Sequence, residues 1–336
     1  MNMNMNKKPF FIIGTVCIVL ILIIAVILII ESGKNPSQSI NYVMSNGISS
    51  PQVTQQPDVP ENEITNEVTD PNEQKIEGEI TYVETTDGGK IPVPPTFEYV
   101  EGDSKTGAVI QDKNENQFVW VPISDINNYQ RQVFVNNGEG TKIEDIDELN
   151  LKDIEDYDSS YDDSILNYGG FYVARYEAGR EIDNEKPVSK AGVIPWTQIV
   201  WEKARNLSKE MYSENDYFQT DLINSYAWDS ICNWMRSTGT NIDDSTNYGN
   251  YQNSSNGLNK VVETGSNIRW KVNNIYDMAG NAWEYTTEQY GDHERYHIGR
   301  GGGYWNYGNY YPISTRGTSE DGSDLYIGFR VVLYLK

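Results

Sequence analysis

The chain has 336 residues, 26 of them basic and 49 acidic, and its net charge of −23 argues against a surface that binds nucleic-acid phosphates. Its length fits about two domains, or one large domain with appendages. There are only two cysteines, Cys17 and Cys232. Because Cys17 lies in an apolar segment, we predict that the rest of the chain has no internal disulfide and is held by its core or by bound ions.

The first element along the chain is an apolar segment without charged residues at residues 9–30, PFFIIGTVCIVLILIIAVILII. At ~1.5 Å per residue, a helix of this length crosses a hydrocarbon layer ~30 Å thick, so we predict a transmembrane helix. A cleaved signal peptide is the alternative, but residues 31–33 provide no small-residue cleavage site. Two lysines precede the segment, which predicts a cytoplasmic tail at residues 1–8 and an extracellular C-terminal part on a single-pass protein of the cell membrane.

A stalk and one folded domain are predicted after this segment. Residues 31–90 are rich in Pro, Ser, Asn, Gln and acidic residues, a composition that is typical of disorder. We therefore predict a disordered acidic and polar stalk at 31–90 and a folded domain at 91–336.

Several short segments of the folded part alternate or are rich in β-branched and aromatic residues, which predicts strands at residues 107–110, 117–121 and 170–176. The acidic segment 141–164 lies between them. It lacks the glycine and closing glutamate of a calcium-binding loop, so we interpret it as a solvated insertion with about one turn of helix.

Two amphipathic helices are predicted at residues 195–212 and 225–239, because apolar residues recur there every three or four positions. The apolar positions are Trp196, Val200, Ala204, Leu207 and Met211 in the first helix, and Trp228, Ile231, Cys232 and Met235 in the second. Cys232 lies on the apolar face, so we interpret it as a buried apolar residue rather than a nucleophile.

Three sequence blocks near the C-terminus identify a family resemblance. They are NNIYDMAGNAWEY at 273–285, GRGGGYW at 299–305 and IGFRVV at 327–332. In this order they resemble the signature blocks of the formylglycine-generating enzyme family, also called sulfatase-modifying factor domains. Looser likeness extends the resemblance over roughly residues 91–336. It implies an α+β, loop-rich fold of the C-type-lectin-like kind, with two helices and twisted sheets.

The resemblance also implies a structural calcium ion at the turn that precedes the block's tryptophan. Carried over to this chain, the ligands are the side chains of Asn281 and Glu284 and the backbone around Gly280 and Ala282, because Ca²⁺ prefers hard oxygen donors. The alternative is that Glu284 only accepts hydrogen bonds from backbone amides of this turn.

The ligands of the family's known chemistry are missing from the sequence. Members that oxidise a sulfatase cysteine use two cysteines, soft ligands for copper, shortly after the R-G-G block, and residues 301–317 contain none. Iron-dependent relatives need a cluster of histidines, and the chain has two in all. We therefore expect neither copper nor iron, and we assign no catalytic residue.

A match to the H-E-x-x-H pattern of zinc proteases lies at residues 293–297, HERYH. In those enzymes a helix brings both histidines to one metal ion. Flanking glycines leave hardly two turns for a helix here, and the family resemblance implies that the segment leads into a strand. In a strand the histidines would lie roughly 13 Å apart, at ~3.3 Å per residue. Although Glu320 could be a distant third ligand, we interpret the motif as part of a strand rather than as a zinc site.

The segment from Tyr304 to Tyr326 is rich in Tyr, Asn, Ser and Gly, the residues that adaptable binding surfaces use. It resembles the variable tip of C-type-lectin-like receptor proteins, including those diversified by retroelements. The predicted ligand-binding residues are Tyr304, Trp305, Tyr307, Asn309, Tyr310, Tyr311, Ser314 and Arg316. The alternative is that the aromatic residues pack the loops. We expect Trp305 to pack in the core, and Tyr307, Tyr310 and Tyr311 to be exposed.

Together these features predict a membrane-anchored extracellular domain that is non-catalytic and binds a glycan or protein ligand. One alternative is an enzyme of the same family with an unassigned activity that uses Arg316, Tyr310 or acidic residues. Another is a structural component of a cell-surface or phage-derived assembly.

Overall fold

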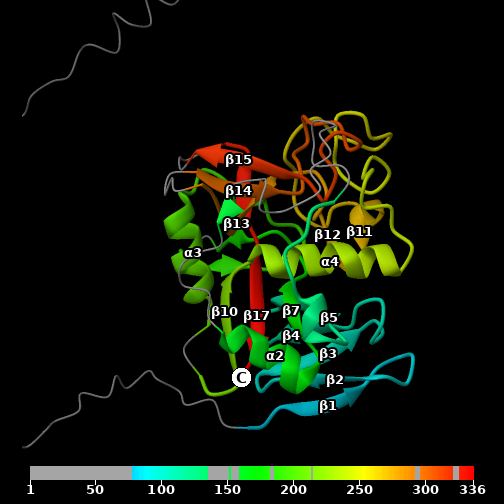
Figure 1. Ribbon diagram of the computed structural model, residues 1–336, viewed down its shortest axis with the longest axis vertical. Coiled ribbons are helices and arrows are strands. Elements are labelled where there is room, and N and C mark those ends of the chain that lie inside the picture. Colours follow the sequence, from blue (N-terminus) through cyan, green and yellow to red (C-terminus); the bar gives the residue numbers. More distant parts are fainter. Residues whose placement is uncertain are drawn as a thin grey trace, which may run out of the picture. The chain divides into compact units, whose positions relative to one another are not determined.

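The computed structural model describes residues 78–134, 151–152, 159–181, 185–212, 215–291, 296–320 and 325–336, and all of them belong to one compact unit (Figure 1). Within these ranges no helix is both long and apolar enough to cross a membrane. The predicted transmembrane helix at 9–30 and most of the predicted stalk lie outside the described residues.

The larger sheet has six strands in the order β10-β17-β7-β5-β4-β3, and every neighbouring pair is antiparallel. The strands predicted at 107–110, 117–121 and 170–176 are confirmed as three of them. The six are β3 (Phe97–Glu101), β4 (Val109–Asp112), β5 (Gln117–Pro122), β7 (Gly170–Ala174), β10 (Phe218–Leu222) and β17 (Val331–Leu335).

This sheet separates two hydrophobic clusters, because successive side chains of a strand point to opposite faces. Val119 and Val173 belong to the cluster around α4, whereas the next residues along each strand, Trp120 and Ala174, belong to the cluster around α3. Burial on both faces explains why β7 and β17 are buried along their whole length.

The smaller sheet has five strands and positions the site described below. Its order is β15-β14-β13-β16, with β6 also paired to β13. The β13 and β16 strands run parallel and the other pairs are antiparallel. Its members are β6 (Leu151–Lys152), β13 (Trp283–Tyr290), β14 (Tyr296–Arg300), β15 (Arg316–Glu320) and β16 (Ile327–Phe329).

The strand interpretation of the HERYH motif is confirmed for its described part. Tyr296 and His297 begin β14, whereas the first histidine and the glutamate of the motif lie outside the described residues. His297 is buried and its ring stacks on the indole of Trp201, with centroids 4.0 Å apart and an angle of 5° between the rings. This histidine therefore packs in the core beside α3.

The described ranges also contain three two-stranded sheets and two short 3-10 helices. The sheets pair β1 (Thr81–Glu84) with β2 (Lys90–Val93), β8 (Gly179–Arg180) with β9 (Pro187–Val188), and β11 (Lys271–Val272) with β12 (Ile275–Tyr276). The 3-10 helices are η1 (Ile126–Asn128) and η3 (Ile268–Trp270).

The β1–β2 hairpin corrects the predicted start of the folded domain. Residues 81–90 were assigned to the disordered stalk, but four consecutive residue pairs join the two strands. The side chain of Asp87 fixes the intervening loop, because its carboxylate accepts hydrogen bonds from Thr85 and Ser104. The polar composition that suggested a stalk therefore extends into a folded hairpin.

Three α-helices lie in the described part of the chain. Helix α4 (Ser225–Ser237) matches the second predicted helix, and the side chain of Asn224 caps it by accepting a hydrogen bond from the amide of Ala227. Its predicted apolar face is confirmed, and it lies between the two sheets (Figure 1). Cys232 on this face is fully buried, and burial raises the pKa of its thiol to about 12.

The other two helices differ from the prediction. Helix α3 (Trp201–Lys209) starts later than residue 195, because Gln198 has a positive φ of 59°, which breaks a helix. Val200 consequently lies outside the helix and is exposed. Helix α2 (Ser160–Tyr168) is longer than the single turn expected within 141–164, because its acidic sequence conceals a buried face formed by Tyr161, Ser164 and Ile165.

Candidate functional site

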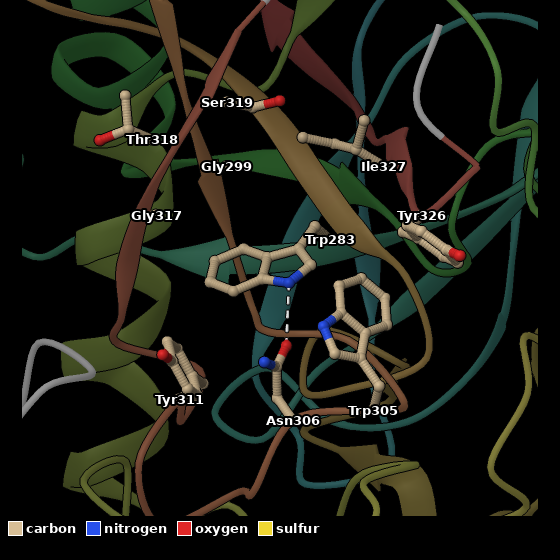
Figure 2. Close-up of a pocket in the computed structure, with 10 residues that line it drawn as sticks. All are labelled: Trp283, Gly299, Trp305, Asn306, Tyr311, Gly317, Thr318, Ser319, Tyr326 and Ile327. Carbon is tan, nitrogen blue, oxygen red and sulfur yellow. Dashed lines mark hydrogen bonds between the residues drawn. The ribbon is translucent and has the colours of Figure 1, made fainter. Parts of the chain in front are cut away.

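A cavity of about 350 Å³ opens over one face of the five-stranded sheet. All four of the longer strands of this sheet contribute to it, together with the loop between β14 and β15 (Figure 2). The residues that line it are Trp283, Gly299, Trp305, Asn306, Tyr311, Gly317, Thr318, Ser319, Tyr326 and Ile327. None of these ten residues carries a charge at neutral pH, so the lining is aromatic and neutral-polar.

Two facing glycines make room for the indole of Trp283. Gly299 of β14 and Gly317 of β15 are directly paired across the two strands. A Cβ atom on Gly317 would lie 2.7 Å from two atoms of the indole, and one on Gly299 would lie 3.3 Å from a third. The Trp283 ring of β13 therefore packs across the backbone of β14 and of β15 beyond it, a position that larger residues in place of the glycines would obstruct.

The carboxamide of Asn306 fixes the Trp283 ring from the side. Its Oδ1 accepts hydrogen bonds from Trp283 Nε1 at 2.9 Å and from the amide of Gly303 at 2.8 Å (Figure 2). Because both partners can only donate, the atom that they contact must be the oxygen. The Nδ2 group of Asn306 is consequently the part of the side chain that remains for a ligand.

Two aromatic side chains form a wall of the cavity. The rings of Trp305 and Tyr326 have centroids 4.6 Å apart, and the side chains are 37% and 38% exposed. The expectation that Trp305 packs in the core is therefore wrong. The reason is Gly303, since a Cβ there would lie 2.4 Å from the Trp305 ring, which folds back over this glycine at the surface.

The other predicted ligand-binding residues of the aromatic segment lie at or near the cavity. Tyr311 lines it, and its ring lies edge-on to Trp283 with centroids 6.0 Å apart. Tyr304 is half-buried and packs against Trp305. The predicted exposure of Tyr307 and Tyr310 is confirmed, at 44% and 52%, whereas Tyr311 is half-buried. Asn309 is exposed beside them.

Ser314 and Arg316, also predicted to bind ligand, do not line the cavity. Ser314 is buried and its hydroxyl donates to the carbonyl oxygen of Ile242. Arg316 precedes Gly317 in β15, so its side chain points to the opposite face of the sheet. Both residues are therefore structural, and the alternation in β15 is the signal that could have assigned Arg316.

On that opposite face Arg316 joins a cluster of buried charges under α4. Asp229 of α4 pairs with both Arg316 and Arg300, the latter at 2.6 Å. Glu288 pairs with Arg316 at 2.7 Å and with Arg131 at 3.2 Å. Burial alone would raise the pKa of Glu288, but the guanidinium groups of Arg316 and Arg300 outweigh it and hold that pKa below its usual value.

The predicted calcium ligands belong to a second buried cluster. Glu284 forms a bidentate pair with Arg330, at 2.6 and 2.8 Å. The Oδ1 atom of Asn281 accepts from the amide of Val262 at 3.0 Å, while its Nδ2 donates to Glu177. The turn's amide at Ala282 donates to Glu177 as well, so Glu177, rather than Glu284, accepts the backbone hydrogen bond of this turn.

This donor set does not fit a Ca²⁺ ion as folded. Both Glu284 oxygens and the Asn281 oxygen are occupied, and the Arg330 guanidinium lies where a cation would have to bind. Among the residues that the structure describes, no group of three or more His, Cys, Asp or Glu side chains is placed to hold a metal ion. The guanidinium group of Arg330 places a positive charge beside Glu284, where the family resemblance implies a calcium ion.

The acidic groups of this cluster bind protons more tightly than usual. Burial, reinforced by the carboxylates of Asp277 and Glu284, raises the pKa of Glu177 well above its ordinary value. Burial raises the pKa of Asp277 to about 6, against hydrogen bonds from Gly265 and Thr264 that lower it. One oxygen of Asp277 is buried without a hydrogen-bond partner, which agrees with a protonated carboxyl at low pH.

Comparison with known proteins finds a family model that matches the C-terminal part of the chain. Residues 183–335 match the model of the sulfatase-modifying factor enzyme 1-like domain. This segment contains all ten residues of the cavity, whereas β3, β4, β5 and β7 of the larger sheet lie before it. No curated protein sequence matches the chain.

Three solved structures are similar to the chain at low sequence identity. CarF is 14% identical with a TM-score of 0.39, over 50% of this chain and 87% of CarF. Treponema denticola variable protein 1 is 15% identical with a TM-score of 0.36, over 71% and 99%. PvdO from Pseudomonas aeruginosa is 14% identical with a TM-score of 0.39, over 68% and 98%.

Proposed function

We propose that residues 183–335, which match the sulfatase-modifying factor enzyme 1-like domain and have mixed sheets and few helices, bind a ligand in the cavity of Figure 2 without oxidising it. The observation that carries the proposal is the chemistry of the cavity lining. The loop that follows the Arg300-Gly301-Gly302 block supplies Trp305, Asn306 and Tyr311 to it, and no cysteine. In oxidase relatives, by the resemblance, the copper-binding cysteines come from this stretch.

The shape and surroundings of the cavity support binding. Its volume of about 350 Å³ lies at the small end of the range of ligand sites, about 300–1,000 Å³. The two loops that supply Trp305 and Tyr326 carry further exposed apolar residues, namely Tyr307, Tyr310 and Leu325. Rigid aromatic side chains gain contact area at a small cost in conformational entropy.

We extend the proposal to the placement of the domain in the cell. The apolar segment at residues 9–30 would anchor the protein in the cell membrane with the domain outside, on a C-type-lectin-like scaffold. The sequence pattern alone supports this anchoring. Protease treatment of intact cells tests it, since external protease should remove the domain if it is displayed outside.

The binding proposal is tested with the full-length protein in detergent. We expect no copper-dependent conversion of a sulfatase-derived cysteine peptide to the formylglycine product, as followed by mass spectrometry. Ligand-observed NMR against a mixed library of sugars, peptides and small neutral molecules should find binders. Trp305→Ala should abolish their binding, whereas the distant exposed variant Tyr82→Ala should retain it. Copper-dependent turnover of the peptide would overturn the proposal.

The alternative functions find less support. Arg316, offered as a catalytic residue, is engaged by Asp229 and Glu288 on the other face of the sheet. If the protein were a structural component of an assembly, crosslinking on cells would recover a stoichiometric protein partner instead of a soluble ligand.

A further inference from the structure

We infer that the ligand of this cavity is an uncharged saccharide, with one pyranose ring stacked on the indole of Trp283 and one of its oxygens accepting a hydrogen bond from Asn306 Nδ2. This inference rests on the proposed binding function and names the ligand class. Four features of the described residues carry it: the charge of the lining, the fixed indole, the donor character of Asn306 and the placement of the polar groups.

The charge of the lining excludes ionic recognition. A carboxylate or phosphate on a ligand is normally met by Arg or Lys, and the part of the lining that the structure describes contains neither. An anionic ligand would also approach a chain with a net charge of −23. Asp and Glu are equally absent from the described lining residues, so an ammonium or guanidinium group would find no counter-ion among them. A neutral ligand fits the lining best.

The indole of Trp283 is a preformed stacking surface. Asn306 holds its ring nitrogen, and the glycine pair at positions 299 and 317 supports its six-membered ring. Figure 2 shows the open ring between Tyr311 on one side and Trp305 and Tyr326 on the other. Because the ring is fixed before binding, a ligand that stacks on it does not have to order the site. Little of the stacking energy is therefore offset by a loss of conformational entropy. The C–H face of a pyranose ring is flat and apolar, as such a surface requires.

Asn306 distinguishes a sugar from an organic cation. Aromatic pockets can also bind quaternary ammonium groups through cation–π attraction. Both hydrogen bonds to Asn306 Oδ1 are made within the protein, so the side chain offers only N–H donors to a ligand. A quaternary ammonium group has no acceptor for these donors and would be repelled by them. A sugar hydroxyl, ring oxygen or N-acetyl carbonyl accepts from them.

The arrangement of polar and apolar groups favours a sugar over a peptide. The indoles of Trp283 and Trp305 supply apolar surface, while Asn306 brings an amide and Ser319, which lies on the same face of β15 as Gly317, brings a hydroxyl to the same small cavity. The ligand must therefore combine an apolar face and polar groups within a single ring-sized unit. A pyranose does so with several hydroxyls around one ring, whereas the tyrosine side chain, the most similar one in a peptide, carries a single hydroxyl.

The test uses the full-length protein in a detergent without a sugar headgroup, because alkyl glycosides would occupy the site. The probes are glucose, galactose, mannose, N-acetylglucosamine and their linear β1,4- and α1,4-linked oligomers. Isothermal titration calorimetry should give saturable binding for at least one of them. Saturation-transfer NMR should show the strongest transfer to hydrogens on one face of the bound ring.

The decisive variant is Asn306→Asp, which keeps an oxygen for Trp283 and Gly303 but replaces the Nδ2 donors by an acceptor. We expect it to weaken saccharide binding by about tenfold or more. Its matched control is Asn309→Asp, which adds the same charge at a nearby exposed position outside the lining. Near-ultraviolet circular dichroism shows whether each variant is folded, and if Asn306→Asp unfolds, Ser319→Ala replaces it, with a smaller expected loss.

The outcomes separate this inference from the proposed function. Binding of peptides or acidic saccharides in the cavity, without any neutral sugar, overturns the saccharide assignment and leaves the binding function standing. Equal losses in Asn306→Asp and Asn309→Asp would place the saccharide outside the cavity and overturn the assignment too. If no ligand of any class binds, both proposals fail.

Discussion

The two faces of the five-stranded sheet have opposite chemistry. On one face Trp283 and Gly317 form a neutral aromatic cavity. On the other face lie Glu284, one residue further along β13, and Arg316, one residue earlier in β15. Glu284 is paired with Arg330 and Arg316 with Glu288, and both ion pairs are buried. Strand alternation alone produces this separation, since neighbours in a strand point to opposite sides.

The difference shows how the domain separates binding from stability. On the ion-paired face, removal of one partner leaves the other charge buried and uncompensated, which is costly. On the cavity face, lining side chains such as Trp305 and Tyr326 are neutral and exposed. These exposed side chains can therefore change with little effect on the fold, whereas the buried charges of the other face cannot.

The largest effect is expected for Asp229→Asn on the ion-paired face. Asp229 is the carboxylate shared by Arg300 and Arg316, so its neutralisation leaves two buried guanidinium groups with one fewer counter-charge. We expect a loss of about 3–5 kcal/mol in the free energy of unfolding. Urea denaturation followed by tryptophan fluorescence measures it. The control Asp216→Asn, at an exposed position, should stay within about 0.5 kcal/mol of the unmodified protein.

A pH-dependent effect of nearly the same size is expected at Asp277. Its pKa is raised from 3.8 to about 6 by burial, so the folded state binds this proton more tightly than the unfolded state. The resulting stabilisation is complete below about pH 3.8 and is lost as the pH rises through about 6. Asp277 should therefore lower the free energy of unfolding by up to about 3 kcal/mol between pH 4 and pH 8, and Asp277→Asn should remove this difference.

Glu288 should behave in the opposite way, which sharpens the comparison between the two buried clusters. Its pKa lies below the ordinary value, so it stabilises the fold at neutral pH, and this contribution is lost as the pH falls through its folded-state pKa. Urea titrations at several pH values should therefore give differences of opposite slope for Asp277→Asn and Glu288→Gln. The same slope for both variants would contradict the assignment of the two clusters.

A smaller loss is expected from Gly317→Ala on the cavity face. The new methyl group would lie 2.7 Å from the Trp283 ring and force it to move, at a cost of about 1–3 kcal/mol. Gly328→Ala in β16 is the matched control, because its nearest neighbour would be 3.5 Å away and its backbone needs no positive φ. Thermal unfolding should show a lower Tm for the first variant and an unchanged or slightly higher Tm for the second.

The smallest effect is expected from metal removal. Arg330 already neutralises Glu284, so chelation with EDTA should leave the Tm unchanged, and elemental mass spectrometry should find no stoichiometric calcium. About one calcium per chain, lost in a Glu284→Ala variant, would instead support the ion implied by the family resemblance and would mean that Arg330 moves when the ion binds.

Much of the fold could be predicted from local pattern. The strands at 117–121 and 170–176 and helix α4 follow directly from alternation and from helical spacing of apolar residues. Helix α2 and the β1–β2 hairpin could not, because their polar sequences resemble a solvated insertion and a stalk. Tyr161 of α2, for example, gains its partners Asp221 and Tyr334 from strands that are distant in the sequence.

The candidate site was predicted only in part. Tyr311 lines the cavity and Tyr307 and Tyr310 are exposed beside it, as composition indicated. The role of Trp283 could not be predicted, because it depends on a glycine pair that becomes adjacent only when β14 and β15 align. Which of two neighbours such as Arg316 and Gly317 faces a cavity is decided by sheet pairing, which residue composition does not contain.

The buried Cys232 gives the domain a built-in reporter of opening. Its thiol is fully enclosed on the buried face of α4, and burial raises its pKa to about 12, so a thiol reagent finds almost no thiolate while the core is closed. In a chain that carries Cys17→Ser, labelling of Cys232 would occur only when the core between the two sheets opens. The labelling rate would then measure how often the packed interior gives way while ligand binding at the cavity is followed separately on the same molecule.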